Sequence, residues 1–310
     1  MTNDKGNDMT EIAVNTVADI DVPLEGITSP RHLISHSEVE AFGQCEQKHD
    51  YAHVQQLEPV TQGRALVRGN AGHHFQEMFL KAIKDEMSTA AATKHAVNDL
   101  YDTDYEPDII GEVLKITKPW CEFVWPTLGW KVVDVEKEFR LTIDERLVYP
   151  FKVDAIVEHR GELKLVDHKF VYDPYDATTI RLMPQMPRYI AALRMMGIPV
   201  VSGIYNFMRT RELKDPFGAT KKYTQVPVEP NEHRLRHSLL EQVQEMRKID
   251  AIENTPPENR LIPVRTANKM NCGHCGFAEL CAMELEGRDS KLMRRVSFQP
   301  NTYGYKELPE

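Results

Sequence analysis

Two aspartates and a lysine near the middle of the chain have the residue types that bind a metal ion and assist proton transfer. Asp154 lies in the apolar run FKVDAIVEH, whereas Asp167 and Lys169 lie in a second apolar run, ELKLVDHKF. Both runs are rich in Val, Ile, Leu and Phe and are separated by turn residues, a composition typical of adjacent antiparallel strands. We therefore expect one β-hairpin to carry all three side chains.

The turn of this hairpin determines which residues face each other. A two-residue turn at Arg160 and Gly161, in which Gly161 supplies the positive φ, places Asp154 opposite Asp167. Opposed Cβ atoms lie about 4.5–5.5 Å apart, and Lys169 shares their face because it is two residues from Asp167. Two buried carboxylates at this distance repel each other and lose solvation. A divalent cation between them would convert this cost into a binding site.

The chemistry of such a pair depends on whether its face of the hairpin is buried. Ile156, Leu163 and Leu165 fall on the same face as the two aspartates, which indicates at least partial burial. Carboxylate oxygens are preferred ligands of Mg²⁺ and Mn²⁺, and Lys169 could act beside the metal ion. The alternative is a solvated hairpin face on which the charged residues occur by chance.

Four of the five cysteines form a second group that could bind a metal. Cys272, Cys275 and Cys281 have the spacing C-x2-C-x5-C, and Cys45 lies far upstream. In a reducing compartment this spacing indicates a metal site rather than disulfides, although buried, inert thiols are the alternative. Three thiolates need a fourth ligand to complete a zinc tetrahedron or an iron–sulfur cubane. Cys45 is a better candidate than His274, which adjoins Cys275 and has little reach, and it would join the N-terminal helix to the C-terminal tail.

Two further pairs of polar residues have helical spacing. His73 and Glu77 lie four residues apart in GNAGHHFQE, and Gln185 and Tyr189 lie four apart in QMPRY. Residues at this spacing share one face of a helix. A structural histidine and a half-buried tyrosine at a helix start would give the same patterns, so neither pair identifies a site alone.

The elements that would position these residues form a mixed series of helices and strands. A capping-box pair, Ser37 and Glu40, marks the first helix. We expect helices at 37–51, 69–87, 187–196 and 231–252, and strands at 131–142, 150–158, 163–171, 200–209 and 223–228. This order predicts an α/β (α+β) fold in which a central mixed sheet is flanked by helices.

Composition divides the chain into five expected regions and describes an ordinary globular protein. The 310 residues are 41% hydrophobic and 27% charged, and no apolar stretch approaches the length of a membrane span. Residues 1–28 carry acids and no apolar core, which predicts a disordered acidic tail rather than a signal peptide. An intracellular, cytoplasmic location with reduced cysteines follows.

The other regions are 29–130, helical with Cys45 and His73; 131–255, the core; 256–290, the cysteine segment; and 291–310, a tail.

The charge distribution bears on the class of partner. A net charge of −9 counts against an indiscriminate polyanion binder. A local basic stretch can still bind nucleic acid within an acidic protein. The segment from Arg209 to Lys222 has five basic and two acidic residues. It is either such a stretch or a solvated loop.

Taken together, these motifs resemble the RecB-like branch of the PD-(D/E)XK nuclease superfamily. They look most like its iron–sulfur members: CRISPR-adaptation exonucleases, AddB-type nuclease domains and their phage-encoded relatives. The resemblance runs from about Ser35 to Cys281 and follows the order of the motifs in the family. It implies a core like that of restriction endonucleases, with an iron–sulfur staple joining the N-terminal helix and the C-terminal tail.

The resemblance also implies a role for each residue of the hairpin region. GNAGHHFQE is similar to the family's G-x-x-x-H-x-x-x-E segment, which makes His73 a ligand of Mg²⁺ or Mn²⁺. VDAIV and VDHKF look like the two acidic motifs. Asp154 and Asp167 would then be metal ligands and catalytic residues, and Lys169 the catalytic lysine.

The remaining motifs extend the resemblance to a helix and to the cysteines. QMPRY is similar to Q-x-x-x-Y, in which Gln185 and Tyr189 would support the lysine and contact DNA. Pro187 departs from the expected helix because proline is tolerated only in its first turn; a helix that starts at Pro187 leaves Gln185 outside it. The stretches SHSEVEAFGQCEQKHDY and CGHCGFAELC resemble the opening helix and closing triplet of the family. A [4Fe–4S] cluster is implied on four residues: Cys45, Cys272, Cys275 and Cys281.

The resemblance predicts a metal-dependent DNA exonuclease that acts on single-stranded DNA or DNA ends. The expected setting is recombination, repair or phage DNA processing, in the host cytoplasm if the protein is phage-encoded. No helicase P-loop is present, so unwinding would require a helicase or recombination protein as partner. One alternative is a catalytically silent DNA-binding or recombination-accessory protein, although Asp154, Asp167 and Lys169 are all intact. Another is a zinc-stapled structural protein with a chance hairpin.

Overall fold

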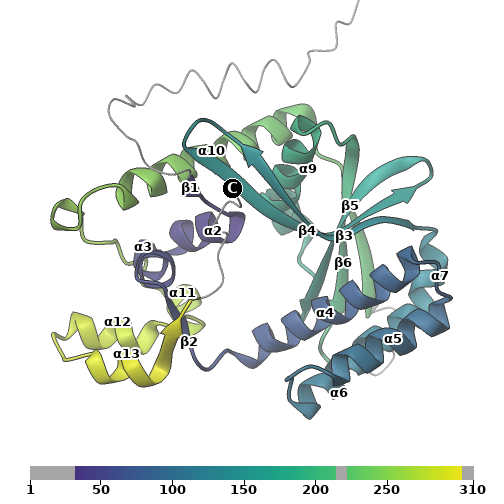
Figure 1. The fold of residues 1–310 in the computed structure, drawn as a ribbon, viewed down its shortest axis with the longest axis horizontal. Helices are drawn as coiled ribbons and strands as arrows, with labels where there is room; N and C mark the ends of the chain where they lie inside the picture. Colours follow the sequence, from purple (N-terminus) through teal and green to yellow (C-terminus); the bar gives the residue numbers. More distant parts are fainter. Residues whose placement is uncertain (1–31, 214–221, 302–310) are drawn as a thin grey trace, which may run out of the picture. The chain divides into compact units, whose positions relative to one another are not determined.

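A computed structural model of the protein describes residues 32–213 and 222–301 and contains two compact units (Figure 1). The first unit comprises Met1–Gly63, Arg140–Phe151 and Leu239–Glu310. The second comprises Arg64–Phe139 and Lys152–Ser238. The predicted acidic tail 1–28, most of the basic stretch 209–222 and the last nine residues of the predicted tail 291–310 lie outside the described residues.

The second unit contains the hairpin and the helices that surround it. Its helices are α4 (Arg64–Lys84), α5 (Thr89–Tyr101), α6 (Pro107–Pro119), the π-helix η2 (Trp120–Val124), α7 (Trp125–Leu128), α8 (Ala177–Leu182) and α9 (Gln185–Met195). Its strands are β3 (Lys131–Thr142) and β4 (Leu147–His159), which each belong partly to the first unit, β5 (Glu162–Val171), β6 (Val200–Arg209) and β7 (Tyr223–Val228). The expected bounds of β3, β6 and β7 are confirmed.

The first unit combines segments from both ends of the chain. Its elements are β1 (His32–Leu33), α2 (His36–Gln44), α3 (Glu46–His49), the π-helix η1 (Asp50–Val54), β2 (Leu57–Pro59), most of α10 (Glu232–Glu253), the short helix η3 (Pro257–Asn259), α11 (Lys269–Gly273), α12 (Ala278–Leu285), α13 (Lys291–Ser297) and β8 (Phe298–Pro300). β2 pairs antiparallel with β8, and a small core of Tyr51, Phe277, Leu280 and Phe298 lies beside this pair. Among the described residues, every helix is too short or too polar to cross a lipid bilayer.

The first helix starts earlier than the capping-box pattern predicts. Ser35, not Ser37, is the N-cap of α2, and its hydroxyl accepts a hydrogen bond from the backbone N–H of Glu38 at 3.2 Å. Both serines suit an N-cap position chemically. Ile34, which immediately precedes this N-cap, is fully buried.

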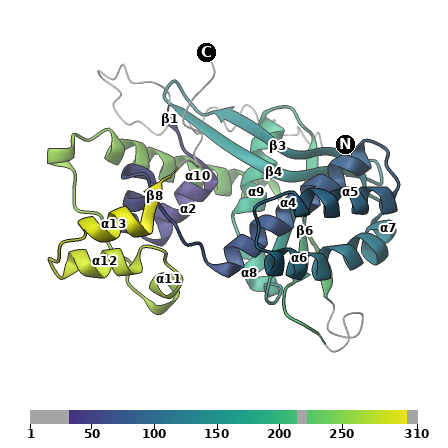
Figure 2. The ribbon, with the colours of Figure 1, turned by 60° about the horizontal axis from the view of Figure 1, so that its bottom comes forward.

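The strands form the predicted mixed sheet. Their order is β1-β4-β5-β6-β7, and β3 pairs with β4. The β4/β5 and β6/β7 pairs are antiparallel, whereas β5 and β6 are parallel and are connected through α8 and α9. In the second unit, α4, α5 and α6 pack together on one side of the strands (Figure 2). Gly203 contacts Met186 of α9, while its neighbour Ile204 belongs to the α4–α6 core, so α9 covers the opposite face.

The hairpin that was predicted from the turn residues is present in the expected register. His159 pairs with Glu162 and Ala155 with Val166. Gly161 has a φ of 81°, and Arg160 also has a positive φ, 57°. Positive φ at both central residues is the requirement of a type I′ turn, whose twist matches that of the flanking strands.

A glycine in α4 sets the distance between this helix and the hairpin. A Cβ atom on Gly72 would lie 2.6–2.7 Å from three ring atoms of Phe170 on β5. A Cβ atom on Gly69, one turn earlier on the same helix, would have no neighbour within 4 Å. The helix therefore approaches the strand more closely at Gly72, which immediately precedes His73, than at Gly69.

We expect Gly72→Ala to destabilise the protein by about 1–3 kcal/mol, because the added methyl group overpacks the contact with Phe170. Gly69→Ala is the matched control and should stabilise by about 0.5–1 kcal/mol, since alanine is the better helix former in open space. Urea unfolding of both variants measures the difference. Equal stabilities for the two would mean that α4 does not pack on β5 in this way.

Candidate metal-binding and catalytic site

The hairpin strands bring the two predicted aspartates and the predicted lysine into one small region. Lys169 Nζ lies 3.1 Å from Asp167 Oδ1 and 2.8 Å from Asp167 Oδ2. Asp154 Oδ2 accepts a hydrogen bond from the backbone N–H of His168 at 2.7 Å, which fixes this carboxylate beside β5. A small pocket is lined by Asp154 and Asp167 together with residues of α9.

Helix α9 supplies the polar residues that the Q-x-x-x-Y pattern predicts. Gln185 Oε1 accepts a hydrogen bond from Lys169 Nζ at 2.9 Å, and Tyr189 lines the pocket beside the aspartates. α9 begins at Gln185, so the expected start at Pro187 is wrong. Pro187 lies in the first turn, where its missing N–H leaves no helical hydrogen bond unmade.

Helix α4 places His73 against the same aspartate. His73 Nδ1 lies 3.3 Å from Asp154 Oδ2. Glu77, one turn further along, instead forms an ion pair with Lys81. The helical pair predicted from spacing therefore divides into one residue at the site and one on its periphery.

Glu136 on β3 is an acidic residue of this region that the sequence did not reveal. Ligand atoms of His73, Glu136 and Asp154 lie within 4.8 Å of one another, close enough to hold one metal ion. The Glu136 side chain is 8% exposed and pairs with Lys152 Nζ at 2.6 Å. Its backbone φ is 48°, in the left-handed region that costs a residue with a side chain of order 1–3 kcal/mol. Strained backbone of this kind concentrates at functional sites.

The electrostatics of the region favour the binding of additional positive charge. Burial raises the pKa of Asp167 to about 6, despite the opposing effect of Lys169. Burial also raises the pKa of Asp154, but His73 outweighs this effect and holds that pKa well below its usual range. Burial and the charge of Asp154 raise the pKa of Glu136. Three carboxyl groups thus share one buried region, and a cation would stabilise their charged forms.

The two basic groups respond to the carboxylates in the opposite sense. Burial lowers the pKa of His73, but Asp154 more than compensates and the value rises to about 9. Burial likewise lowers the pKa of Lys169, but Asp167 raises it above its ordinary value. Lys169 is therefore an ammonium group throughout the neutral pH range.

One carboxylate oxygen in the region, Asp167 Oδ2, accepts no hydrogen bond and is available as a metal ligand. This oxygen is buried, and its partner is the Lys169 ammonium, with which it forms an ion pair at 2.8 Å from Nζ. Carboxylate oxygens with one imidazole nitrogen suit Mg²⁺ or Mn²⁺. His73, Glu136 and Asp154 are therefore placed to hold one divalent metal ion, whereas Asp167 lines the same small pocket as Asp154 without belonging to this close group.

A buried histidine lies between Asp167 and Lys169 but points to the other face of β5. His168 is 1% exposed, and Asn206 Nδ2 donates to His168 Nδ1 at 2.8 Å. Burial lowers the pKa of His168 to about 4, so the imidazole is neutral. Its ring packs edge-on against Trp120 at 6.1 Å between centroids. His168 is thus a core residue that supports the strand.

The predicted cluster cysteines all lie in the first unit, in two segments that contact each other. Asn271 Nδ2, next to Cys272, donates to the backbone oxygen of Gln44, next to Cys45, at 3.0 Å. Burial raises the pKa of Cys275, and the nearby thiols of Cys45 and Cys272 raise it further.

Within the described residues, however, the cysteine sulfurs do not form a close group. No three of them lie within 4.8 Å of one another. Cys281 Sγ accepts a hydrogen bond from Arg265 Nε at 3.2 Å and packs against the small core that contains Tyr51.

Most of the chain matches one known protein family. A family model described as the PD-(D/E)XK nuclease superfamily matches residues 33–282. None of the curated proteins matches the chain.

Three solved structures resemble parts of the fold at low sequence identity. A candidate exonuclease from Eubacterium rectale has 12% identity and a TM-score of 0.49, with 76% of this chain and 84% of that chain covered. The protein SSO0001 has 12% identity and a TM-score of 0.37, with coverage of 89% and 96%. An alkaline exonuclease from Laribacter hongkongensis has 14% identity and a TM-score of 0.23, with coverage of 56% and 92%. Each of these similarities is too low to identify a function.

Proposed function

Because this chain belongs to the PD-(D/E)XK nuclease superfamily, we propose that it is a metal-dependent DNA exonuclease of the RecB-like branch. The observation that carries this proposal is that Asp154, which contacts His73, and Asp167, which contacts Lys169, line one small pocket. The proposed substrate is single-stranded DNA or a DNA end. The proposed setting is recombination, repair or phage DNA processing, with a helicase or recombination protein as a partner.

The proposed metal ion is Mg²⁺ or Mn²⁺, held by His73, Asp154 and Asp167. When bound, such an ion lowers the pKa of a water molecule and offsets negative charge on the scissile phosphate. The two aspartates differ in how readily they ionise, because their environments differ. Asp154 stays ionised at all relevant pH values, whereas Asp167 depends on positive charge nearby to stay ionised at neutral pH.

Lys169 acts as a fixed positive charge in this proposal. A lysine whose pKa is raised donates hydrogen bonds but accepts no proton. Its ammonium group would therefore stabilise negative charge that develops on the phosphate oxygens, rather than remove a proton from water. Gln185 Oε1 accepts a hydrogen bond from the Lys169 ammonium and so orients it, while Tyr189 lines the pocket where DNA would lie.

We further propose that Cys45, Cys272, Cys275 and Cys281 bind a [4Fe–4S] cluster. Support comes from the contact between the segments of Cys45 and Cys272. The C-x2-C-x5-C spacing and the resemblance to iron–sulfur members of the family are the further support, and zinc on the same four cysteines is the alternative.

Digestion of end-labelled single- and double-stranded DNA tests the nuclease proposal directly. We expect shortening of the labelled strand with Mg²⁺ or Mn²⁺ and none with excess chelator. Asp154→Asn protein is the control for a contaminating nuclease. DNA binding without cleavage in either metal would contradict the proposal and favour a catalytically silent accessory protein.

We expect His73→Ala to lower the cleavage rate less than Asp167→Ala and to be partly restored by raised Mn²⁺. The imidazole is a neutral ligand among charged ones when it binds metal, and Mn²⁺ accepts nitrogen more readily than Mg²⁺. Loss of a residue that merely orients a ligand already costs roughly tenfold or more in metal affinity, so a shift of at least about tenfold is expected. Cleavage rates are measured against Mn²⁺ concentration.

Glu77→Ala is the matched control for this measurement, since Glu77 lies on the same helix face but pairs with Lys81. Its metal dependence should overlay that of the unmodified protein. If the His73→Ala curve also overlaid it, His73 would be a structural residue and not a ligand.

A further inference from the structure

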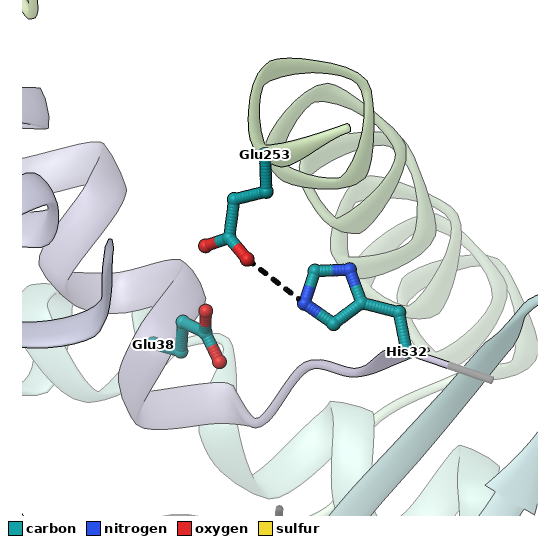
Figure 3. A group of neighbouring side chains, drawn as sticks. All are labelled: His32, Glu38 and Glu253. Atoms are coloured by element: carbon teal, nitrogen blue, oxygen red, sulfur yellow. Dashed lines mark ion pairs between the residues drawn. The ribbon is translucent and has the colours of Figure 1, made fainter. Parts of the chain in front are cut away.

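A second group of histidines and acids lies in the first unit, among elements that carry none of the predicted catalytic residues. His32 comes from β1, Glu38 from α2, His49 from α3 and Glu253 from the end of α10. Ligand atoms of His32, Glu38 and Glu253 lie within 4.8 Å of one another. Figure 3 shows these three side chains pointing into one shared space. We propose that this group binds a divalent transition metal, with Zn²⁺ the best match.

His32, Glu38 and Glu253 form the close group, and His49 lies beside its two carboxylates. His32 Nε2 lies 3.1 Å from Glu253 Oε2, and His49 Nε2 lies 3.3 Å from Glu38 Oε1 and 3.6 Å from Glu253 Oε1. In a tetrahedral zinc site with bonds of about 2.0–2.2 Å, neighbouring ligand atoms lie about 3.4 Å apart. The His49–Glu38 contact is a long hydrogen bond at 3.3 Å, whereas the His49–Glu253 contact at 3.6 Å lies beyond the usual 2.7–3.2 Å range.

Protons alone do not satisfy the carboxylates in this group. His49 Nε2 carries at most one hydrogen, yet it faces oxygens of both Glu38 and Glu253. Glu253 Oε1 is buried and accepts no hydrogen bond. The single Nε2 hydrogen of His49 can be used by Glu38, whose side chain is only 10% exposed, and Glu253 Oε1 is then left without a donor. A cation shared by both carboxylates resolves this deficit.

The orientation of His32 is the one that metal ligation requires. Its Nε2 faces Glu253, while its Nδ1 lies 3.1 Å from Asp250 Oδ1. Asp250 is fixed in turn by Arg146, whose guanidinium lies 2.7 Å from Oδ2. A ligating histidine almost always donates its other ring N–H to a carboxylate, which sets its tautomer and its direction. The His32–Asp250 pair has this arrangement.

The chemical class of the ion follows from the donor set. Two imidazole nitrogens with two carboxylate oxygens suit Zn²⁺ and its neighbours in the first transition row rather than Mg²⁺ or Ca²⁺. His53 adds a third imidazole, with Nδ1 3.8 Å from Glu38 Oε1. Since the ligands come from β1, α2, α3 and α10, the ion would connect segments from both ends of the chain and stabilise the first unit.

Titration of the full-length protein with Co²⁺, a coloured substitute for Zn²⁺, tests this proposal. We expect a visible d–d band typical of tetrahedral Co²⁺ with nitrogen and oxygen ligands, distinct from the near-ultraviolet charge-transfer bands of cysteine thiolates. The band should disappear when Zn²⁺ displaces Co²⁺ from the site. It should persist in Asp154→Asn protein, because that substitution alters only the proposed catalytic region. Absence of the band from the unmodified protein overturns the proposal, and no variant of the four residues is needed for that result.

Variants on helix α10 locate the ion. Glu253→Gln should lower Zn²⁺ affinity at least tenfold and remove the Zn²⁺-dependent rise in Tm, whereas Asp250→Asn should weaken binding without abolishing it. Glu245→Gln is the matched control, because Glu245 is on the same helix and pairs with Lys248. Equal Zn²⁺ affinity and equal stabilisation in Glu253→Gln and Glu245→Gln would show that the ion binds elsewhere.

Discussion

Lys169→Ala protein should cleave DNA about 10²–10³-fold more slowly than the unmodified protein, the usual cost of removing one group that stabilises charge in the transition state. Asp154→Asn and Asp167→Asn should show no measurable cleavage, because each removes a charged metal ligand. DNA affinity should stay within about tenfold in all three, since these side chains act on the transition state more than on substrate binding. Single-turnover cleavage and a separate binding measurement distinguish the two effects.

Lys164→Ala is the matched control for Lys169→Ala. Lys164 lies on the same strand, but the odd separation between the two residues places their side chains on opposite faces. Its cleavage rate should match that of the unmodified protein. Near-normal turnover in Lys169→Ala, Asp154→Asn or Asp167→Asn would contradict the assignment of the catalytic site.

Purified protein should be brown and contain four irons per chain, and Cys45→Ser should remove both the colour and the iron. The loss should equal that in Cys275→Ser, because each substitution removes one ligand of a single cluster. Both variants should also unfold at lower denaturant concentration, since metal-binding free energy contributes to folding. Iron content, the visible spectrum and urea unfolding are measured on protein prepared without oxygen.

Cys121→Ala is the control, because Cys121 is fully buried in the core of the second unit. It should keep its iron even if the cavity lowers its stability. Retention of iron and colour by Cys45→Ser would exclude a cluster that joins the two ends of the chain. A colourless protein that contains zinc would favour the zinc alternative.

The hairpin could be predicted from the sequence because its determinants are local. Arg160 and Gly161 specify the turn, the turn specifies the register, and the register brings Asp154 and Asp167 together. The start of α4 was predicted too late, at residue 69, because glycine disfavours helix interiors. Gly72 is present in this helix for a reason that the sequence does not show, the ring of Phe170 on a distant strand.

Residues brought in by tertiary structure could not be predicted in this way. Asp134, Glu136 and Glu138 alternate along one strand, and nothing in their spacing identifies Glu136 as the one at the site. Of the three, Glu136 is the one with a positive φ in the folded chain. Likewise, His32 and Glu253 meet only because β1 lies beside the end of α10.

The left-handed backbone at Glu136 has a consequence for the protein under selection. Glycine and asparagine adopt this conformation at less cost than glutamate does, so either would relax the strand but remove a carboxylate beside Asp154. A library screened for heat resistance alone would accumulate such replacements, and activity would fall with them where Glu136 helps to hold the proposed metal ion. A library screened for turnover would retain glutamate together with its strain. Position 136 is therefore where thermostability and activity trade against each other in directed evolution.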